Sequence, residues 1–146
     1  MAITQAIANA FKEQLLEGDA NFSSSGGDVF KLALYTSSAT LNSATTSFTT
    51  TNEVANTGTY ASGGDPLAGQ NTSIASGVAI VDFADLSFTG VTLTARGAMI
   101  YNTSSAVTNA AVAILDFGAD KTATSGTFTI QFPAFTTAAA ILRISG

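Results

Sequence analysis

The sequence predicts a mainly β protein, an antiparallel β-sandwich of jelly-roll type with one N-terminal α-helix. First, apolar and polar side chains alternate with a period of two after residue 28, as in strands with one buried face. Second, turn segments rich in Gly, Ser and Asn separate these stretches at short intervals. Third, no helical pattern falls between the strands, so a parallel sheet with helical crossovers is excluded.

The N-terminal segment, residues 1–18, is expected to form the only good helix. Apolar residues recur every four positions at Ile3, Ile7, Phe11 and Leu15, which gives one apolar stripe along AITQAIANAFKEQLLEG. Gly18 is a natural C-terminal stop. A helix of this length is marginal alone, so we expect its stripe to pack on its own domain or on a neighbouring chain.

Residues 19–146 are expected to form a single β-sandwich domain with long loops at 37–73. These loops are rich in Ser, Thr, Ala, Asn and Gly, and one or two short strands are expected near Glu53-Val54 and Thr59-Tyr60. So long a span of loop is usually functional or interface-forming; ordering only on assembly is the alternative. The expected strands lie in DVFKLALYT, IASGVAIVDF, GVTLTARGAMIYN, AAVAILDFG, GTFTIQFP and AAILRIS, and the expected turns in FTG, YNTSSAVTN and ADKTATSG.

Arg96 is an unusual residue within the expected strand GVTLTARGAMIYN. The strand carries apolar side chains on one face (Val91, Leu93, Ala95, Gly97 and Met99) and Thr92, Thr94 and Arg96 on the other. A lone charge is costly if it is buried without a partner. We therefore expect Arg96 either to pair with an acidic residue across a strand or an interface, or to face water.

The composition indicates a protein that lies against other protein. The chain has 146 residues, the size of one domain. Only 10% of the residues are charged, against about 25% in ordinary soluble domains, and neutral Thr, Ser, Asn and Gly make up most of the polar remainder. Solubility usually relies on interspersed charge, so such a surface suits a bound protein better than a free monomer.

The charge pattern argues against nucleic acid and membrane as partners. The net charge is −5, and the five basic residues are scattered singly along the chain, whereas nucleic-acid binding needs a clustered basic face. No stretch reaches the ~20 apolar residues of a membrane span. Residues 1–17 lack the basic and apolar regions of a signal peptide, so synthesis in the cytoplasm is expected.

No residue is predicted to be catalytic, to bind a cofactor or to bind a metal, and the chain is not expected to be an enzyme. The chain contains no Cys and no His, which excludes thiolate catalysis, a Ser-His-Asp triad, disulfides and nearly every zinc site. A Ser-Lys pair is chemically possible, but no motif localises one. The carboxylate pairs Asp82/Asp85 and Asp116/Asp120 do not match a calcium loop, and acceptance of turn hydrogen bonds is the favoured interpretation.

The tripeptide Asp116-Phe117-Gly118 is shared with the magnesium-binding motif of protein kinases. A kinase also needs a glycine-rich phosphate loop, a strand lysine paired with a helix glutamate, and a catalytic loop, none of which occurs in this sequence. We therefore expect Phe117 to lie in the core, Asp116 to accept turn hydrogen bonds, and Gly118 to let the chain turn.

Several segments in order resemble a family of small virion structural proteins of tailed bacteriophages. These segments are MAITQAI, the helix ending in LLEG, FKLALYTSSATLNSATT, TARGAMIYN and AVAILDFGADKTATSGTFTIQFP. The resemblance is clearest over residues 1–50 and 94–133 and weakest around 60–75. It implies a structural component of the particle. Similarity in size and β character to capsid cement or decoration proteins implies a homo-oligomer, a dimer or trimer, on the capsid exterior that bridges major capsid protein subunits.

Two other functions remain open at the level of sequence. The first is a different virion position, as a tail, neck or fibre-associated component. The second is a carbohydrate-binding β-sandwich module, which would need exposed aromatic residues. The chain has no Trp, three Tyr and ten Phe, so this supply is limited.

Overall fold

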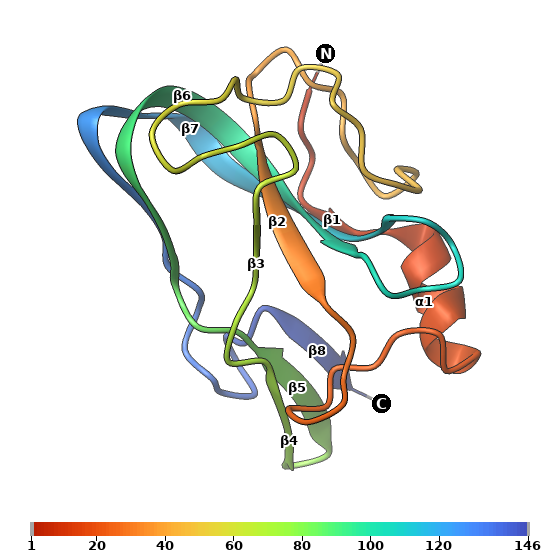
Figure 1. Cartoon of the computed structure of the whole chain (residues 1–146). Coiled ribbons are helices and arrows are strands. Elements are labelled where there is room, and N and C mark those ends of the chain that lie inside the picture. The colour runs from red at the N-terminus through yellow and green to blue at the C-terminus, as the bar shows by residue number, and fades with distance from the viewer. Residues whose placement is uncertain (1, 146) are drawn as a thin grey trace.

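The computed structural model describes residues 2–145 and shows two antiparallel sheets and one short helix (Figure 1). The five-stranded sheet has the order β1-β7-β6-β2-β3, and the three-stranded sheet has the order β4-β5-β8. The elements are β1 (Ala6–Ile7), α1 (Asn9–Leu16), β2 (Phe30–Tyr35), β3 (Asp65–Pro66), β4 (Asn71–Ala75), β5 (Val78–Asp82), β6 (Leu86–Asn102), β7 (Ala110–Ile130) and β8 (Leu142–Ser145). The predicted mainly β fold with one helix is confirmed. The division into five and three strands does not establish jelly-roll connectivity.

The large sheet is built on one long hairpin of β6 and β7. The two strands pair from Leu86↔Ile130 to Asn102↔Ala110, and the loop between them falls in the predicted turn YNTSSAVTN. The predicted faces of β6 are confirmed, because Val91, Leu93, Ala95, Gly97 and Met99 are buried while Thr92 and Thr94 are exposed. β2 pairs with the other edge of β6. The period-two pattern therefore identified the face of β6 that covers the core.

Two predicted turns lie inside these long strands. The segment FTG belongs to β6 and the segment ADKTATSG belongs to β7, and the β6–β7 register shifts at several points near them. Gly90 has a φ of 60° and Ser125 a φ of 46°, so the backbone bends there without ending the pairing. Bulges of this kind bend and twist a strand while the ladder continues on both sides. GTFTIQFP, expected as a separate strand, is accordingly the far part of β7 and the residues that follow it.

The small sheet contains a hairpin that was expected to be one strand. Residues 74–83, IASGVAIVDF, contribute to both β4 and β5, which pair with each other across Ser76 and Gly77. These two residues have φ values of 50° and 77°, as a two-residue type I′ turn requires. Ile80 is buried as expected, but Ile74 is 73% exposed and does not share its face.

The N-terminal helix is shorter than the predicted span of residues 1–18. It covers only Asn9–Leu16, whereas Ala6–Ile7 forms strand β1 on the edge of β7. Ile3 makes an isolated bridge with Leu41 and packs over Gly97, where a Cβ atom would lie 3.0 Å from Ile3 Cδ1. The free edge of β7 satisfies the backbone of this segment, and this long-range pairing outweighs a weak helical preference.

A cluster of phenylalanine rings joins the helix to both sheets. Phe22 stacks on Phe30 of β2 with ring centroids 4.3 Å apart, and Phe11 of α1 meets the edge of Phe22 at 5.9 Å. Phe83, directly after β5, meets both Phe22 and Phe30, and it also contacts Phe132, beyond β7. All five rings belong to one buried core, so α1 packs on its own chain and the sheets share a core.

The segment 37–73 consists mostly of loops that cross over the large sheet (Figure 1). The strands expected near Glu53-Val54 and Thr59-Tyr60 are reduced to single bridges, Tyr35↔Glu53 and Thr57↔Tyr60. The longer pairings in this span are those of β3 with β2 and of the start of β4 with β5, and Leu41 and Ser47 form single bridges with Ile3 and Ala110. No helix among residues 2–145 has the length and apolar character needed to cross a membrane.

Replacing Phe30 by Ala should destabilise the chain strongly. The ring is fully buried and contacts Phe22 and Phe83, so the substitution leaves a cavity at the junction of the sheets, with an expected loss of roughly 3–5 kcal/mol. Urea unfolding followed by circular dichroism measures this loss. Ile74→Ala is the matched control, because Ile74 is largely exposed and should change stability by about 0.5 kcal/mol or less. Similar losses for both variants would contradict the assigned core.

Candidate interaction surfaces

Glu53 holds the loop span 37–73 against the large sheet. Its Oε1 atom accepts hydrogen bonds from the Tyr60 hydroxyl at 2.8 Å and from the Gly63 N–H at 2.6 Å. Its Oε2 atom accepts from the Ser62 hydroxyl at 2.8 Å. The Leu34 N–H in β2 donates in turn to the Tyr60 hydroxyl oxygen at 2.9 Å. These bonds satisfy the Glu53 carboxylate within the chain, so its role is to anchor loops.

All three tyrosines take part in anchoring these loops. The Tyr101 hydroxyl donates to the Gly63 carbonyl and the Tyr35 hydroxyl to the Thr49 carbonyl, each at 2.6 Å. The rings are almost completely buried, and burial raises the pKa of each tyrosine, with the nearby Glu53 charge adding to the effect. For Tyr101 the pKa rises to about 12. The phenol groups therefore stay protonated and serve as hydrogen-bond donors.

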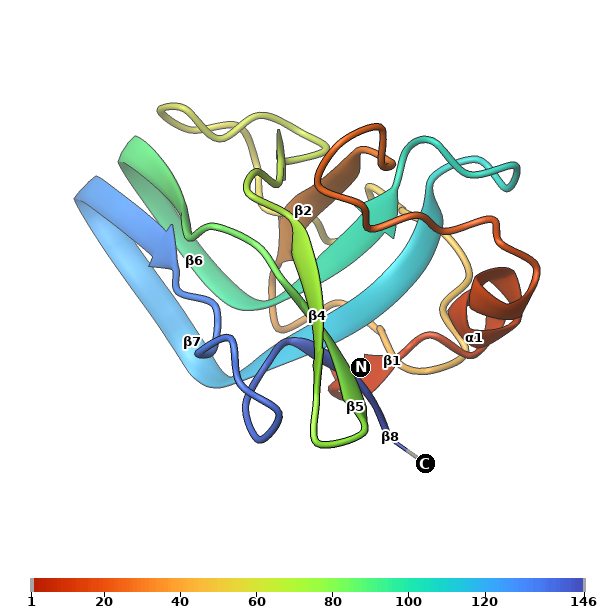
Figure 2. The ribbon, with the colours of Figure 1, turned by 90° about the horizontal axis from the view of Figure 1, so that it is seen from below.

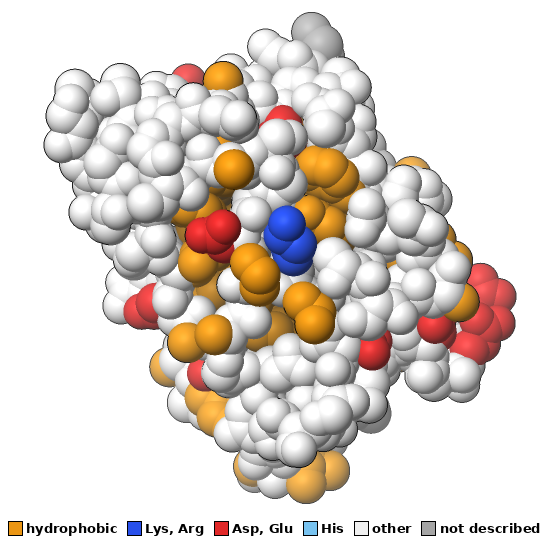
Figure 3. Space-filling view, viewed as in Figure 1, with side chains coloured by type: hydrophobic (Ala, Val, Ile, Leu, Met, Phe, Trp, Pro, Cys, Tyr) orange, Lys and Arg blue, Asp and Glu red, His pale blue; other side chains and the backbone are white. Residues whose placement is uncertain are grey.

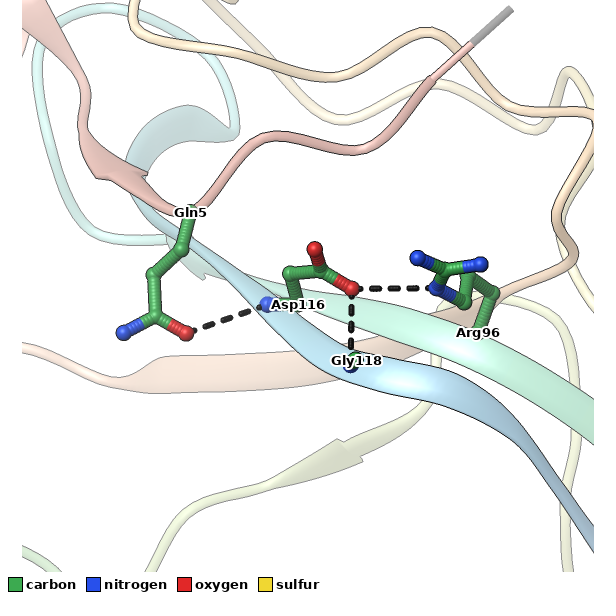
Figure 4. A network of polar contacts seen from close by, with 4 residues as sticks. All are labelled: Gln5, Arg96, Asp116 and Gly118. Carbon is green, nitrogen blue, oxygen red and sulfur yellow. Dashed lines mark hydrogen bonds and ion pairs between the residues drawn. The ribbon is translucent and has the colours of Figure 1, made fainter.

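Arg96 pairs with Asp116 across the β6–β7 hairpin (Figure 4). Arg96 Nε lies 3.1 Å from Asp116 Oδ1, and the Gly118 N–H donates to the same oxygen at 2.9 Å. The Asp116 N–H donates to Gln5 Oε1 at 3.2 Å. The side chain of Arg96 is 34% exposed and that of Asp116 is 26% exposed. Arg96 therefore has an acidic partner on the neighbouring strand, as the first expectation stated, and is also partly open to water, as the second stated. The Gly118 N–H and then Arg96 lower the pKa of Asp116.

The Asp116-Phe117-Gly118 tripeptide lies in a bulge. Between the pairs Ala95↔Lys121 and Gly97↔Asp116, β6 has the single residue Arg96 where β7 has residues 117–120. Gly118 adopts a φ of 81°, and Phe117 is half-buried against the core. Asp116 accepts the local hydrogen bond that was expected, but the chain bends within a strand and does not turn back.

The other carboxylates play structural roles or face water. Asp85 Oδ1 accepts a hydrogen bond from the Phe132 N–H at 2.8 Å, which ties the start of β6 to the end of β7. Asp120 is exposed. Within residues 2–145, no group of three or more acidic side chains is arranged to hold a metal ion.

The outer face of the β6–β7 hairpin is covered with hydroxyl groups. Ser87 pairs with Thr129 at 2.8 Å, and Thr94 pairs with Thr122 at 2.9 Å, oxygen to oxygen. The exposed members of this face are Ser87, Thr89, Thr92, Thr94, Thr122, Thr124, Thr127 and Thr129. Figure 3 shows that neutral polar groups and backbone also dominate another side of the molecule, with sparse charges and apolar atoms gathered near its centre.

An apolar groove with a volume of about 810 Å³ lies between α1 and the small sheet. On the helix side it is lined by Phe11, Leu15 and Leu16; on the sheet side it is lined by Val81, Leu142 and Ile144. Leu16 is 91% exposed and Ile144 is 59% exposed. We call this surface the α1–β8 groove. Exposed apolar side chains that lie together, as Leu16 and Ile144 do along this groove, are typical of interaction surfaces, whereas singly exposed ones are ordinary.

Sequence reasoning missed the α1–β8 groove. Leu16 was assigned to the helix but not to its apolar stripe, and AAILRIS was treated only as a closing strand. The alternation of Leu142, Arg143 and Ile144 is a signal for a strand with one apolar face, but the sequence does not reveal that this face lies beside α1. The role of Glu53 was equally hidden, because its partners are set by the loop path.

Comparisons with known proteins found no match: no family model, no curated protein and no solved structure is significantly similar to this chain.

The tyrosine hydrogen bonds predict a loss of stability at alkaline pH. The folded pKa of Tyr101, about 12, lies above its ordinary value of 10.0. Its contribution is therefore complete below pH 10 and is lost as the pH rises through about 12, because unfolding allows the phenol to ionise. Urea unfolding across this pH range, with phenolate absorbance recorded in parallel, measures the effect. Tyr101→Phe should show a weaker pH dependence, and an unchanged one would contradict the assignment.

Proposed function

We propose that this chain is a structural virion protein of a tailed bacteriophage, a cement or decoration protein on the capsid exterior that bridges and stabilises major capsid protein subunits. The observation that carries the proposal is the α1–β8 groove, an exposed apolar surface on a chain whose other surfaces are largely neutral. The resemblance to small virion proteins supports it, and its segments FKLALYT, TARGAMIYN and AVAILDFGADKTATSGTFTIQFP form most of β2, β6 and β7.

The surface chemistry suits a bridging role. Hydroxyl groups on the β6–β7 hairpin can be covered by another protein at little desolvation cost compared with charged side chains. The chain exposes 7040 Å², whereas a standard interface covers about 800 Å² of each partner. One molecule therefore has enough surface to contact two capsid subunits and further copies of itself, in a dimer or trimer.

A second virion position, in the tail, neck or fibre base, would use the same surfaces. The carbohydrate-binding alternative is less well supported, since a sugar platform needs an exposed aromatic ring. Every aromatic side chain within residues 2–145 is buried or half-buried.

Quantitative mass spectrometry of purified particles tests this function. A cement protein should be present at about one copy per major capsid protein, or at a simple fraction of it, and particles lacking it should lose heat resistance. A count of about twelve or fewer per particle, as in a ring-shaped neck or tail part, would favour the second position. Absence of the chain from the particle would overturn the virion role.

A further inference from the structure

The α1–β8 groove borders a sheet edge that has no partner strand. β8 is the last strand in the order β4-β5-β8, and it pairs only with β5, from Val81↔Leu142 to Val78↔Ser145. Apart from this ladder, residues 142–145 make no backbone hydrogen bond to the rest of the described chain. Figures 1 and 2 show α1 on the β8 side of the small sheet. Unpaired strand edges are templates for another strand.

The opposite edge of the small sheet has a different character. β4 is exposed along its whole length, and its sequence NTSIA is mostly polar. The groove extends over one face of the small sheet, where Thr72, Ala79 and Val81 line it, and reaches the edge strand β8. In β8, Leu142 and Ile144 alternate with Arg143. An added strand at β8 would therefore gain both main-chain hydrogen bonds and a place for alternate apolar side chains, the two contributions that peptide addition to a sheet requires.

The charges at the α1–β8 groove indicate the chemistry of the occupant. The only charged side chains that line it within the described residues are Lys12 and Arg143, on a chain with a net charge of −5. Lys12 Nζ contacts Asn9 Oδ1 at 3.3 Å and Arg143 Nη1 donates to the Thr137 carbonyl at 3.1 Å, and neither forms an ion pair within residues 2–145. Two copies meeting groove to groove would bring these cations together. Carboxylates on the occupant would complement them.

We propose that the α1–β8 groove receives an extended apolar segment of the major capsid protein that carries acidic side chains. The segment adds as a strand beside β8, its apolar side chains pack against Leu16 and Ile144, and its carboxylates pair with Lys12 and Arg143. This inference rests on the proposed capsid-binding function and names the surface and the partner chemistry through which it acts.

Two groove variants and their matched controls test the inference by co-sedimentation with purified capsid shells that lack this protein. Ile144→Ser removes an apolar contact, and its control Val107→Ser removes an apolar side chain from the loop between β6 and β7, outside the groove, where the side chain is 48% exposed. Lys12→Glu with Arg143→Glu reverses the charge at the groove, and Lys121→Glu is its control on the exposed face of β7. All the substituted side chains lie at the surface, so we expect every variant to fold. Thermal unfolding of each variant checks this.

We expect Ile144→Ser and the double charge reversal each to weaken shell binding by about tenfold or more, and the controls to bind like the original chain. Binding of the original chain should also weaken with added salt, and the charge-reversed variant should lose this dependence. Hydrogen exchange should show that the amides of residues 142–145 become protected on the shell. Equal binding by all variants, or unchanged exchange in β8, would overturn the inference.

The outcomes separate this inference from the proposed function. If the original chain fails to bind shells, capsid binding itself is contradicted. If it binds and the groove variants bind equally well, only the assignment of the groove is contradicted. Sedimentation velocity of the chain without shells completes the test: self-association that Ile144→Ser abolishes would identify a second copy as the occupant and overturn the capsid segment.

Discussion

The pairing of β6 with β7 is the constraint on which the rest of the structure depends. Their hairpin forms the centre of the large sheet, with β1 on the outer side of β7 and β2 on the outer side of β6. One face supplies much of the core, while the other presents the Ser and Thr hydroxyls. Bulges let so long a hairpin curve, as Figure 2 shows, and Phe132, just beyond the end of β7, contacts Phe83 beside the small sheet. The phenylalanine cluster then fixes α1 and β5 against this frame.

The sequence was sufficient to predict the two faces of β6 but neither the bends within the long strands nor the hairpin that separates Ile74 from Ile80. The alternation of apolar and polar residues from Val91 to Met99 predicts that one face of the strand is buried, because successive side chains in a strand point to opposite faces. Gly90 and Gly118 were read as turn residues, and they do adopt positive φ angles. A glycine at positive φ is equally compatible with a turn and with a bulge. Whether a turn or a bulge forms depends on contacts with residues distant in the sequence. Asp116, for example, is held by Arg96 and Gln5, whose positions depend on the completed sheet.

Only the chemical character of the interaction surfaces, and not their location, could be predicted from the sequence. The composition indicated a neutral surface with little charge, and the hydroxyl face of β6–β7 has this character. The α1–β8 groove is different, because Leu16 and Ile144 come from opposite ends of the sequence and meet only through the fold. The shortened helix also depends on a distant contact, because residues 6–7 pair with β7 and the helix begins only at Asn9.

A surface with few charges has a specific consequence for assembly. Covering neutral hydroxyls and apolar side chains requires little removal of tightly held water, so large contacts can form without many compensating ion pairs. Such contacts are weakly directional, and two cations at an apolar groove would supply direction that the neutral faces lack. In the proposed complex, Lys12 and Arg143 beside an open strand edge would therefore select the partner through charge and strand pairing together.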